Sequence, residues 1–213
     1  MDLLDLIKLS NHSDDHDKKE EMIEKYNRTS HFYDNRYKQI QYEKFRIITE
    51  NLSLNMILYL EDKIILDGGA GTGLFFDYIK KYFKKAFEIT FSYIGTDISL
   101  NMLNRFKKKL SSNQIQGENK MHLILADLEH LPLRENSINS IFLITSLQNL
   151  PNPHRGLVES IRVGKSCADV NISILRKKLK QKKLEEFLQK HLDNLNIIDL
   201  DQIEDLILMG QKS

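Results

Sequence analysis

The stretch Ile64-Ile65-Leu66-Asp67-Gly68-Gly69-Ala70-Gly71-Thr72-Gly73 is the most informative part of the sequence. Its three leading apolar residues predict a short buried strand, and the apolar pattern from Leu74 to Phe83 predicts a helix directly after the glycines. Glycine permits positive φ and lets a ligand approach the main chain, while the first N–H groups of a helix favour an anionic group. The stretch therefore predicts a ligand-binding strand-loop-helix unit, with a purely structural turn as the alternative.

The spacing of the glycines narrows the class of ligand. A dinucleotide-binding loop requires Gly-x-Gly-x-x-Gly, and counting from Gly69 places Leu74 where the third glycine should be. The pattern present, Asp67-x-Gly69-x-Gly71-x-Gly73, resembles instead the first motif of class I S-adenosylmethionine-dependent methyltransferases. The resemblance implies that Asp67 faces the amino end of the methionyl group of S-adenosylmethionine, and that the three glycines lie under its carboxylate.

Two further acids follow predicted strands. The strand predicted over Ala86 to Ile94 leads to Asp97, whose carboxylate offers two acceptors to the vicinal hydroxyls of a ribose. The strand predicted over Met121 to Ala126 leads to Asp127 and Leu128, which resemble the third motif of the family. The resemblance implies adenine contacts from Ile98, Asp127 and Leu128. Capping of the next turn is the alternative role for Asp127.

Aromatic residues are concentrated before the glycine loop. Tyr33-Asp34-x-x-Tyr37 resembles the Tyr-Asp-x-x-Tyr element of many methyltransferases of this class. The resemblance implies that an N-terminal lid segment, residues 1–50, closes over a cofactor-binding domain, residues 51–213, with Tyr37 at the cofactor. Such a lid would exclude water and flank the sulfonium, whose charge is favoured by π faces. The alternative is that these rings form the apolar face of a helix over Lys38 to Leu54.

The methyl acceptor is expected at the end of the fourth predicted strand, Ser140 to Leu147. Ligands of open parallel sheets lie beyond the carboxyl ends of strands, so the residues expected to border the acceptor are Gln148, Asn149, Pro151, Asn152 and His154. We predict Tyr33, Gln148 and Asn149 as the catalytic residues. The alternative is that Gln148 and Asn149 only satisfy loop backbone groups. The stretch is not the Asn-Pro-Pro-Tyr of amide and adenine N-methyltransferases, so the acceptor atom stays open.

The order of elements resembles the class I methyltransferase fold from about Tyr33 to Lys212. It implies an α/β, Rossmann-like fold with a mostly parallel seven-stranded sheet, an antiparallel last strand and helices on both faces. The remaining elements are expected as helices over 99–110, 153–163 and from Leu184 to Leu192, and as strands over 168–175, 196–200 and 205–210.

Composition bounds the compartment and the partners. Lys plus Arg number 31 against 30 for Asp plus Glu, so a net charge of +1 gives no overall attraction to nucleic acid or an anionic membrane. The single cysteine, Cys167, excludes an internal disulfide framework, and no Cys/His spacing predicts a metal. Met1 to Ser10 lacks the regions of a signal peptide, and no apolar run reaches membrane-spanning length. We expect a cytoplasmic protein in which the polar run Asn11 to Asp17 is an exposed link or turn.

Several functions remain open at this stage. No insertion covers the acceptor side, which suits a large acceptor such as RNA or a translation protein. The basic run Arg176 to Lys183 offers phosphate contacts, or else a solvated turn. The strand at 121–126 is apolar, lacks proline and is expected at the sheet edge, where it would pair with a partner. Some tRNA, ribosomal RNA and translation-factor methyltransferases are similar in having a small zinc-binding activator subunit on that edge. The alternatives are a small-molecule methyltransferase, a non-catalytic S-adenosylmethionine-binding module, and a dehydrogenase, which Leu74 disfavours.

Overall fold

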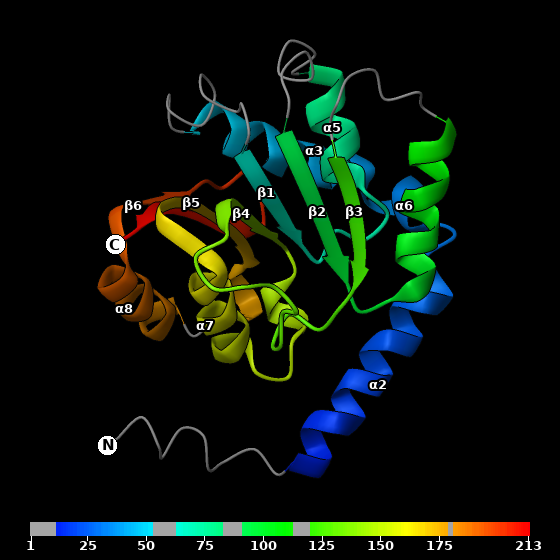
Figure 1. Cartoon of the computed structure of the whole chain (residues 1–213), viewed down its shortest axis with the longest axis horizontal. Helices are drawn as coiled ribbons and strands as arrows, with labels where there is room; N and C mark the ends of the chain where they lie inside the picture. The colour runs from blue at the N-terminus through cyan, green and yellow to red at the C-terminus, as the bar shows by residue number, and fades with distance from the viewer. Residues whose placement is uncertain (1–11, 53–62, 83–90, 113–119, 179–180) are drawn as a thin grey trace.

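A mixed seven-stranded sheet runs through the centre of the computed structural model, which describes residues 12–52, 63–82, 91–112, 120–178 and 181–213 (Figure 1). The strand order is β3-β2-β1-β4-β5-β7-β6. The five neighbouring strands β3, β2, β1, β4 and β5 pair in parallel, and β7 runs antiparallel to β5 and β6. The strands are β1 (Lys63–Gly68), β2 (Phe91–Asp97), β3 (Lys120–Leu125), β4 (Ile138–Ile144), β5 (Gly164–Leu175), β6 (Leu192–Asp199) and β7 (Asp205–Lys212). The predicted mostly parallel sheet with an antiparallel last strand is confirmed.

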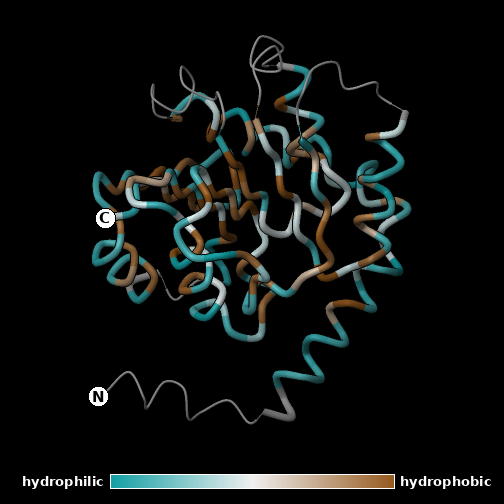
Figure 2. Tube along the Cα trace, viewed as in Figure 1, coloured by the Kyte–Doolittle hydropathy of each residue, from teal (hydrophilic) through white to brown (hydrophobic). Residues whose placement is uncertain are grey.

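Helices cover both faces of the sheet (Figure 1). One face carries α3 (Tyr33–Glu50), α5 (Leu74–Tyr82) and α6 (Leu100–Ser112), and the other carries α7 (Pro153–Val163) and α8 (Gln181–His191). Successive side chains of a strand point to opposite faces, so Ile65 packs in the first apolar layer and Leu66 in the second. Figure 2 shows this apolar centre as brown strands between mostly teal helices. Among the described residues, no helix combines the length and apolarity needed to cross a bilayer.

The N-terminal part differs from the sequence prediction. Helix α2 spans His12–Thr29, so the polar run predicted as a link or turn is helical from His12 onward. A polar helix gains little from packing an apolar face, and its stability comes from tertiary contacts. Here Asn27 Oδ1 accepts a hydrogen bond from Ser99 Oγ at 2.7 Å, which anchors α2 to the start of α6.

Two predicted boundaries also shift. Helix α3 begins at Tyr33 and ends at Glu50, whereas the prediction was Lys38 to Leu54, and Leu54 lies outside the described residues. Strand β2 begins at Phe91, and the predicted start at Ala86 likewise lies outside them. The aromatic residues Tyr33 and Tyr37 therefore belong to the first turns of α3.

Candidate active site

The glycine loop follows β1 at the carboxyl edge of the sheet. The Gly69 N–H donates to the Thr96 carbonyl at 2.8 Å, which joins the loop to the end of β2. Gly71 and Gly73 have φ of 56° and 79°, a region that other residues rarely adopt. A Cβ on Gly71 would have its nearest neighbour 4.0 Å away, whereas one on Gly73 would lie 2.3 Å from Cδ2 of Phe106. Gly71 thus leaves open space beside the loop, and Gly73 permits close packing on α6.

Asp97 lies at the tip of β2 with its carboxylate fixed by the main chain. The Gly71 N–H donates to Oδ2 at 2.9 Å, and the Ser99 N–H donates to Oδ1 at 2.8 Å. Burial raises the pKa of Asp97 to about 6, although these main-chain hydrogen bonds oppose the rise. The remaining lone pairs of the two oxygens are available to hydroxyl donors. This is the arrangement that a ribose-binding acid requires.

Asp67 is buried within β1, where its exposed fraction is 3%. Its Oδ2 accepts the Tyr93 hydroxyl at 2.6 Å. Burial raises the pKa of Asp67 to about 7; the hydrogen bond from Tyr93 opposes this rise and the charge of Asp97 adds to it. The carboxylate does not line the cavity described below, so its contact with a cofactor stays a prediction.

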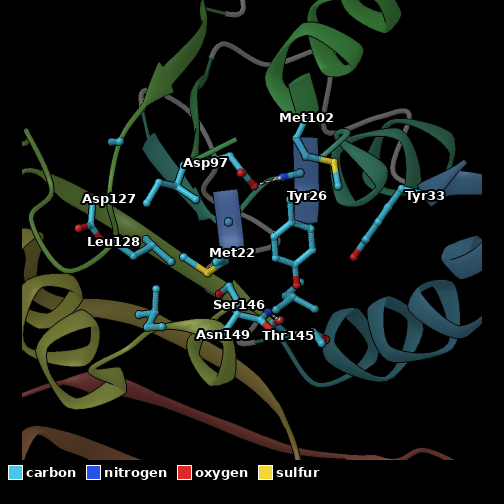
Figure 3. A pocket seen from close by; sticks show the side chains of 16 residues that line it. Met22, Tyr26, Tyr33, Asp97, Met102, Asp127, Leu128, Thr145, Ser146 and Asn149 are labelled. Carbon is cyan, nitrogen blue, oxygen red and sulfur yellow. Dashed lines mark hydrogen bonds between the residues drawn. The ribbon is translucent and has the colours of Figure 1, made fainter. Parts of the chain in front are cut away.

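A cavity of about 70 Å³ lies beyond the carboxyl ends of β1 to β4 (Figure 3). The predicted residues that line it are Tyr33, Gly69, Gly71, Asp97, Ile98, Asp127, Leu128 and Asn149. The predicted residues outside the lining are Tyr37, Asp67, Gly73 and Gln148. Lining residues that the sequence analysis did not assign include Met22, Tyr26, Met102, Thr145 and Ser146. Of these, Thr145 and Ser146 were open to prediction, because they end a buried strand beside Asn149.

The tip of β3 contributes Asp127 and Leu128. Asp127 Oδ1 accepts the Glu129 N–H at 2.8 Å, so this acid does satisfy its own turn. Its Oδ2 lies 2.7 Å from Nζ of Lys19 on α2. Leu128 is 5% exposed and offers an apolar surface to the cavity. The capping role and the ligand-facing position of Asp127 are therefore compatible.

The tip of β4 forms the opposite wall. Ser146 is 9% exposed, and its Oγ lacks a hydrogen-bond partner among the described residues. Asn149 Nδ2 donates to the Thr145 carbonyl at 3.0 Å, which leaves its Oδ1 for other contacts. Gln148 Oε1 accepts the Leu175 N–H at 3.3 Å and joins the short helix η2 (Leu147–Asn149) to β5. His154 packs edge-on to a phenylalanine of α8 and does not line the cavity.

A buried ion pair supports Thr145 from beneath. Lys44 of α3 and Asp205 of β7 are 3% and 0% exposed, and Nζ lies 2.8 Å from Oδ1. Lys44 also donates to Thr145 Oγ1 at 3.0 Å, while Ser173 Oγ donates to Asp205 Oδ2 at 2.5 Å. Removing either charge would leave the other uncompensated. Lys44 and Asp205 lie far apart in the sequence, which gave no signal of this pair.

Two tyrosines face the cavity from the N-terminal helices (Figure 3). Burial raises the pKa of Tyr26 to about 12 and that of Tyr33 above its ordinary value, with the charge of Asp97 adding to both. Both hydroxyls therefore stay protonated near neutral pH. Tyr37 packs on Tyr33, with ring centroids 4.8 Å apart.

A glycine loop and acids at neighbouring strand tips, on a sheet of this order, define a class I methyltransferase fold. The model of the methyltransferase domain family matches residues 66–170. The chain thus resembles the methyltransferase domain family over these residues and has the class I methyltransferase fold.

Individual relatives agree with this assignment. The chain is 30% identical over 133 residues to an uncharacterised protein of Methanocaldococcus jannaschii, covering 62% of this chain and 50% of that protein. It thus spans about half the length of this curated relative. A methyltransferase of Aquifex aeolicus has a TM-score of 0.62 at 16% identity, with 88% and 98% of the two chains covered. A chain from the complex of the Haloferax volcanii Trm112 methyltransferase activator with a methyltransferase has a TM-score of 0.67 at 11% identity, with 90% and 97% covered.

S-adenosylmethionine is the cofactor of this family. The side chains around the cavity have the chemical groups that its ribose and adenine need. Asp97 has free acceptor lone pairs for ribose hydroxyls, Gly71 borders open space, and Asp127 and Leu128 offer an acceptor and an apolar surface to a base. Ligand pockets usually hold at least about 300 Å³, whereas the cavity measures about 70 Å³. The cavity is therefore narrower in this structure than a usual ligand pocket.

Proposed function

We propose that the chain transfers a methyl group from S-adenosylmethionine to a nucleophile on RNA by in-line displacement. The observation that carries methyl transfer is the meeting of Gly71, Asp97 and Asp127, from three strand tips, around one cavity. The bound cofactor supplies an electrophilic methyl group whose leaving group is a neutral thioether. No acid is needed, so the protein acts by positioning and desolvation, with a base only for an acceptor that must lose a proton.

The residues proposed to orient the acceptor lie on the β4 side of the cavity. Asn149 and Tyr33 both line it, and Tyr33 is a protonated donor. Gln148 acts in this proposal by holding η2 against β5. The N-terminal segment, residues 1–50, is the proposed lid over the domain formed by residues 51–213, because both Tyr26 and Tyr33 face the cavity.

Positive charge beside the acceptor wall supports RNA as the acceptor. The turn η3 (Arg176–Lys178) follows β5, the neighbour of β4, and presents Lys177 and Lys178 to solvent. Arg176 holds this turn, because its Nε lies 2.6 Å from Asp199 Oδ1 and its guanidinium donates to two nearby carbonyls. Exposed lysines attract phosphates in a salt-dependent manner.

The edge strand β3 supports an activator subunit as partner. It ends the sheet and pairs only with β2 within the described residues. Leu125 is 55% exposed, and Met121, Leu123 and Ile124 are half-buried. An apolar edge of this kind invites pairing with another chain. The complex of a Haloferax volcanii methyltransferase with an activator, on the same fold, supports an activator partner in general, and we propose that this partner is a small zinc-binding subunit on β3.

The test is incubation with labelled S-adenosylmethionine and separated RNA, protein and small-molecule extracts, with and without a candidate activator. We expect label in RNA, and more of it with the activator. Leu125→Asp on β3 should remove the activator effect, whereas Val158→Asp, at an exposed position of α7, should not. If the label appeared in the protein or small-molecule extract and not in RNA, the acceptor would be of that class and the proposal of RNA would be wrong. Failure of the purified chain, with its activator, to bind S-adenosylhomocysteine would contradict the function itself.

A further inference from the structure

Helix α2 runs past the carboxyl ends of β2 and β3 (Figure 1), contributes Met22 and Tyr26 to the lining of the cavity, and is attached at two places. At the β3 tip, Lys19 Nζ lies 2.7 Å from Asp127 Oδ2 and 2.9 Å from Glu129 Oε2. At the start of α6, Asn27 Oδ1 accepts from Ser99 Oγ and from the Asn101 N–H, at 2.7 and 3.2 Å. The helix thus connects the two strand tips that carry the predicted ribose and adenine acids.

The side chains between these attachments form one wall of the cavity. Met22 and Tyr26 belong to its lining, and Figure 3 shows the Tyr26 ring projecting among the other lining residues. Burial is the main cause of the raised pKa of Tyr26, and the negative charge of Asp97 is the second. The Tyr26 hydroxyl therefore lies within electrostatic range of the predicted ribose acid. With α2 in place, the space left is only about 70 Å³.

Lys19 is well suited to hold the helix down. A cluster of side-chain atoms that could bind a metal ion lies at the β3 tip, where those of Asp127, Glu129 and His130 are within 4.8 Å of one another. The Lys19 ammonium supplies the positive charge at this cluster. Glu129 is 1% exposed, and its Oε1 also accepts the Asn152 N–H at 2.7 Å. Burial opposes the charge on Lys19, yet the hydrogen bonds to the two carboxylates raise its pKa above its ordinary value.

We propose that α2 is an autoinhibitory arm: in the ligand-free chain Lys19 holds the adenine acid Asp127 and Tyr26 fills the space beside the ribose acid Asp97, so the arm must detach before the cofactor binds. This inference rests on the proposed function. The apparent dissociation constant for the cofactor is then the intrinsic constant divided by the fraction of molecules with a detached arm. Weakening the arm should strengthen cofactor binding.

The experiment compares Lys19→Gln with Lys18→Gln, a matched control one residue away in an exposed position. S-adenosylhomocysteine binding is measured by calorimetry, and amide hydrogen exchange over residues 22–29 is measured without ligand. We expect Lys19→Gln to bind at least about threefold tighter, as an increased open fraction requires, and to exchange faster. Lys18→Gln should match the wild type in both. The double variant Lys19→Gln/Glu129→Gln, which leaves no buried charge unpaired, should behave like Lys19→Gln.

The outcomes separate the two proposals. Equal or weaker binding by Lys19→Gln and by the double variant, with the wild type binding normally, would overturn the arm alone. Unchanged hydrogen exchange in α2 would also overturn it, because Lys19 would then not hold the helix. Absence of binding in the wild type and in every variant, with the activator present, would overturn the proposed function and the arm together.

Discussion

The substitutions Gly73→Ala and Gly71→Ala separate the two tasks of the glycine loop. At Gly73, with φ of 79°, an alanine adopts a left-handed conformation, which costs about 1–2 kcal/mol. Its Cβ would also lie 2.3 Å from a ring carbon of Phe106, which is 0% exposed and cannot turn toward solvent. Overpacking of this kind costs about 1–3 kcal/mol, so Gly73→Ala should lower the free energy of unfolding by about 2–5 kcal/mol.

At Gly71, only the conformational part applies, because a Cβ would have its nearest neighbour 4.0 Å away. Gly71→Ala should therefore lower the free energy of unfolding by about 1–2 kcal/mol and weaken binding of S-adenosylhomocysteine, since its methyl group enters the open space beside the loop. Urea unfolding followed by circular dichroism measures the first effect, and calorimetry the second. Equal stability of the two variants, or normal binding by Gly71→Ala, would refute this division of roles.

Three further predictions concern buried charges. The pKa of Asp67 rises from 3.8 to about 7 on folding. The free energy of unfolding should therefore fall as the pH rises from 3.8 to about 7, by up to about 1.4 kcal/mol per pH unit. Asp67→Asn should flatten the dependence of the urea midpoint on pH, while the exposed control Asp201→Asn should keep the wild-type slope; identical slopes would exclude a titrating Asp67. Because the pKa of Asp97 is about 6, binding of S-adenosylhomocysteine should weaken by up to about tenfold per pH unit below that value, and calorimetry of Asp97→Asn should show weak binding without this dependence. Lys44→Met leaves Asp205 buried and unpaired and should lower the free energy of unfolding by about 3–5 kcal/mol, against less than about 0.5 kcal/mol for the exposed control Lys108→Met; equal urea midpoints for the two would mean that the pair contributes nothing.

The parts of the fold that sequence reasoning predicted are those encoded locally. An apolar run followed by glycines predicts β1 and its loop, and an acid directly after an apolar run predicts the positions of Asp97 and Asp127. Parallel strands bring their carboxyl ends to one edge, so both acids line the same cavity. The antiparallel pair β6 and β7 followed from the resemblance to a known fold.

The parts that sequence reasoning missed depend on contacts between distant residues. Helix α2 has a polar sequence, and its attachment depends on Lys19 and Asn27 meeting groups that lie at least 72 residues later in the chain. The close packing of Gly73 on the Phe106 ring was likewise not predicted, while its place beneath the cofactor stays a prediction. Such pairings leave no spacing pattern in the sequence, because tertiary packing alone brings the partners together.

The two strand-tip acids differ in a way that explains how one helix can control the site. Both oxygens of Asp97 are oriented by main-chain N–H groups, those of Gly71 and Ser99. Asp127 has one oxygen held by its own turn, but the other is held by a lysine side chain on a separate helix. Asp97, the predicted ribose acid, is therefore preorganised, whereas Asp127, the predicted adenine acid, must exchange one partner for another under our proposal. In the proposed detachment Lys19 leaves Asp127 and Glu129 together, so Asp127 becomes free for the cofactor while Glu129 keeps the hydrogen bond from the Asn152 N–H.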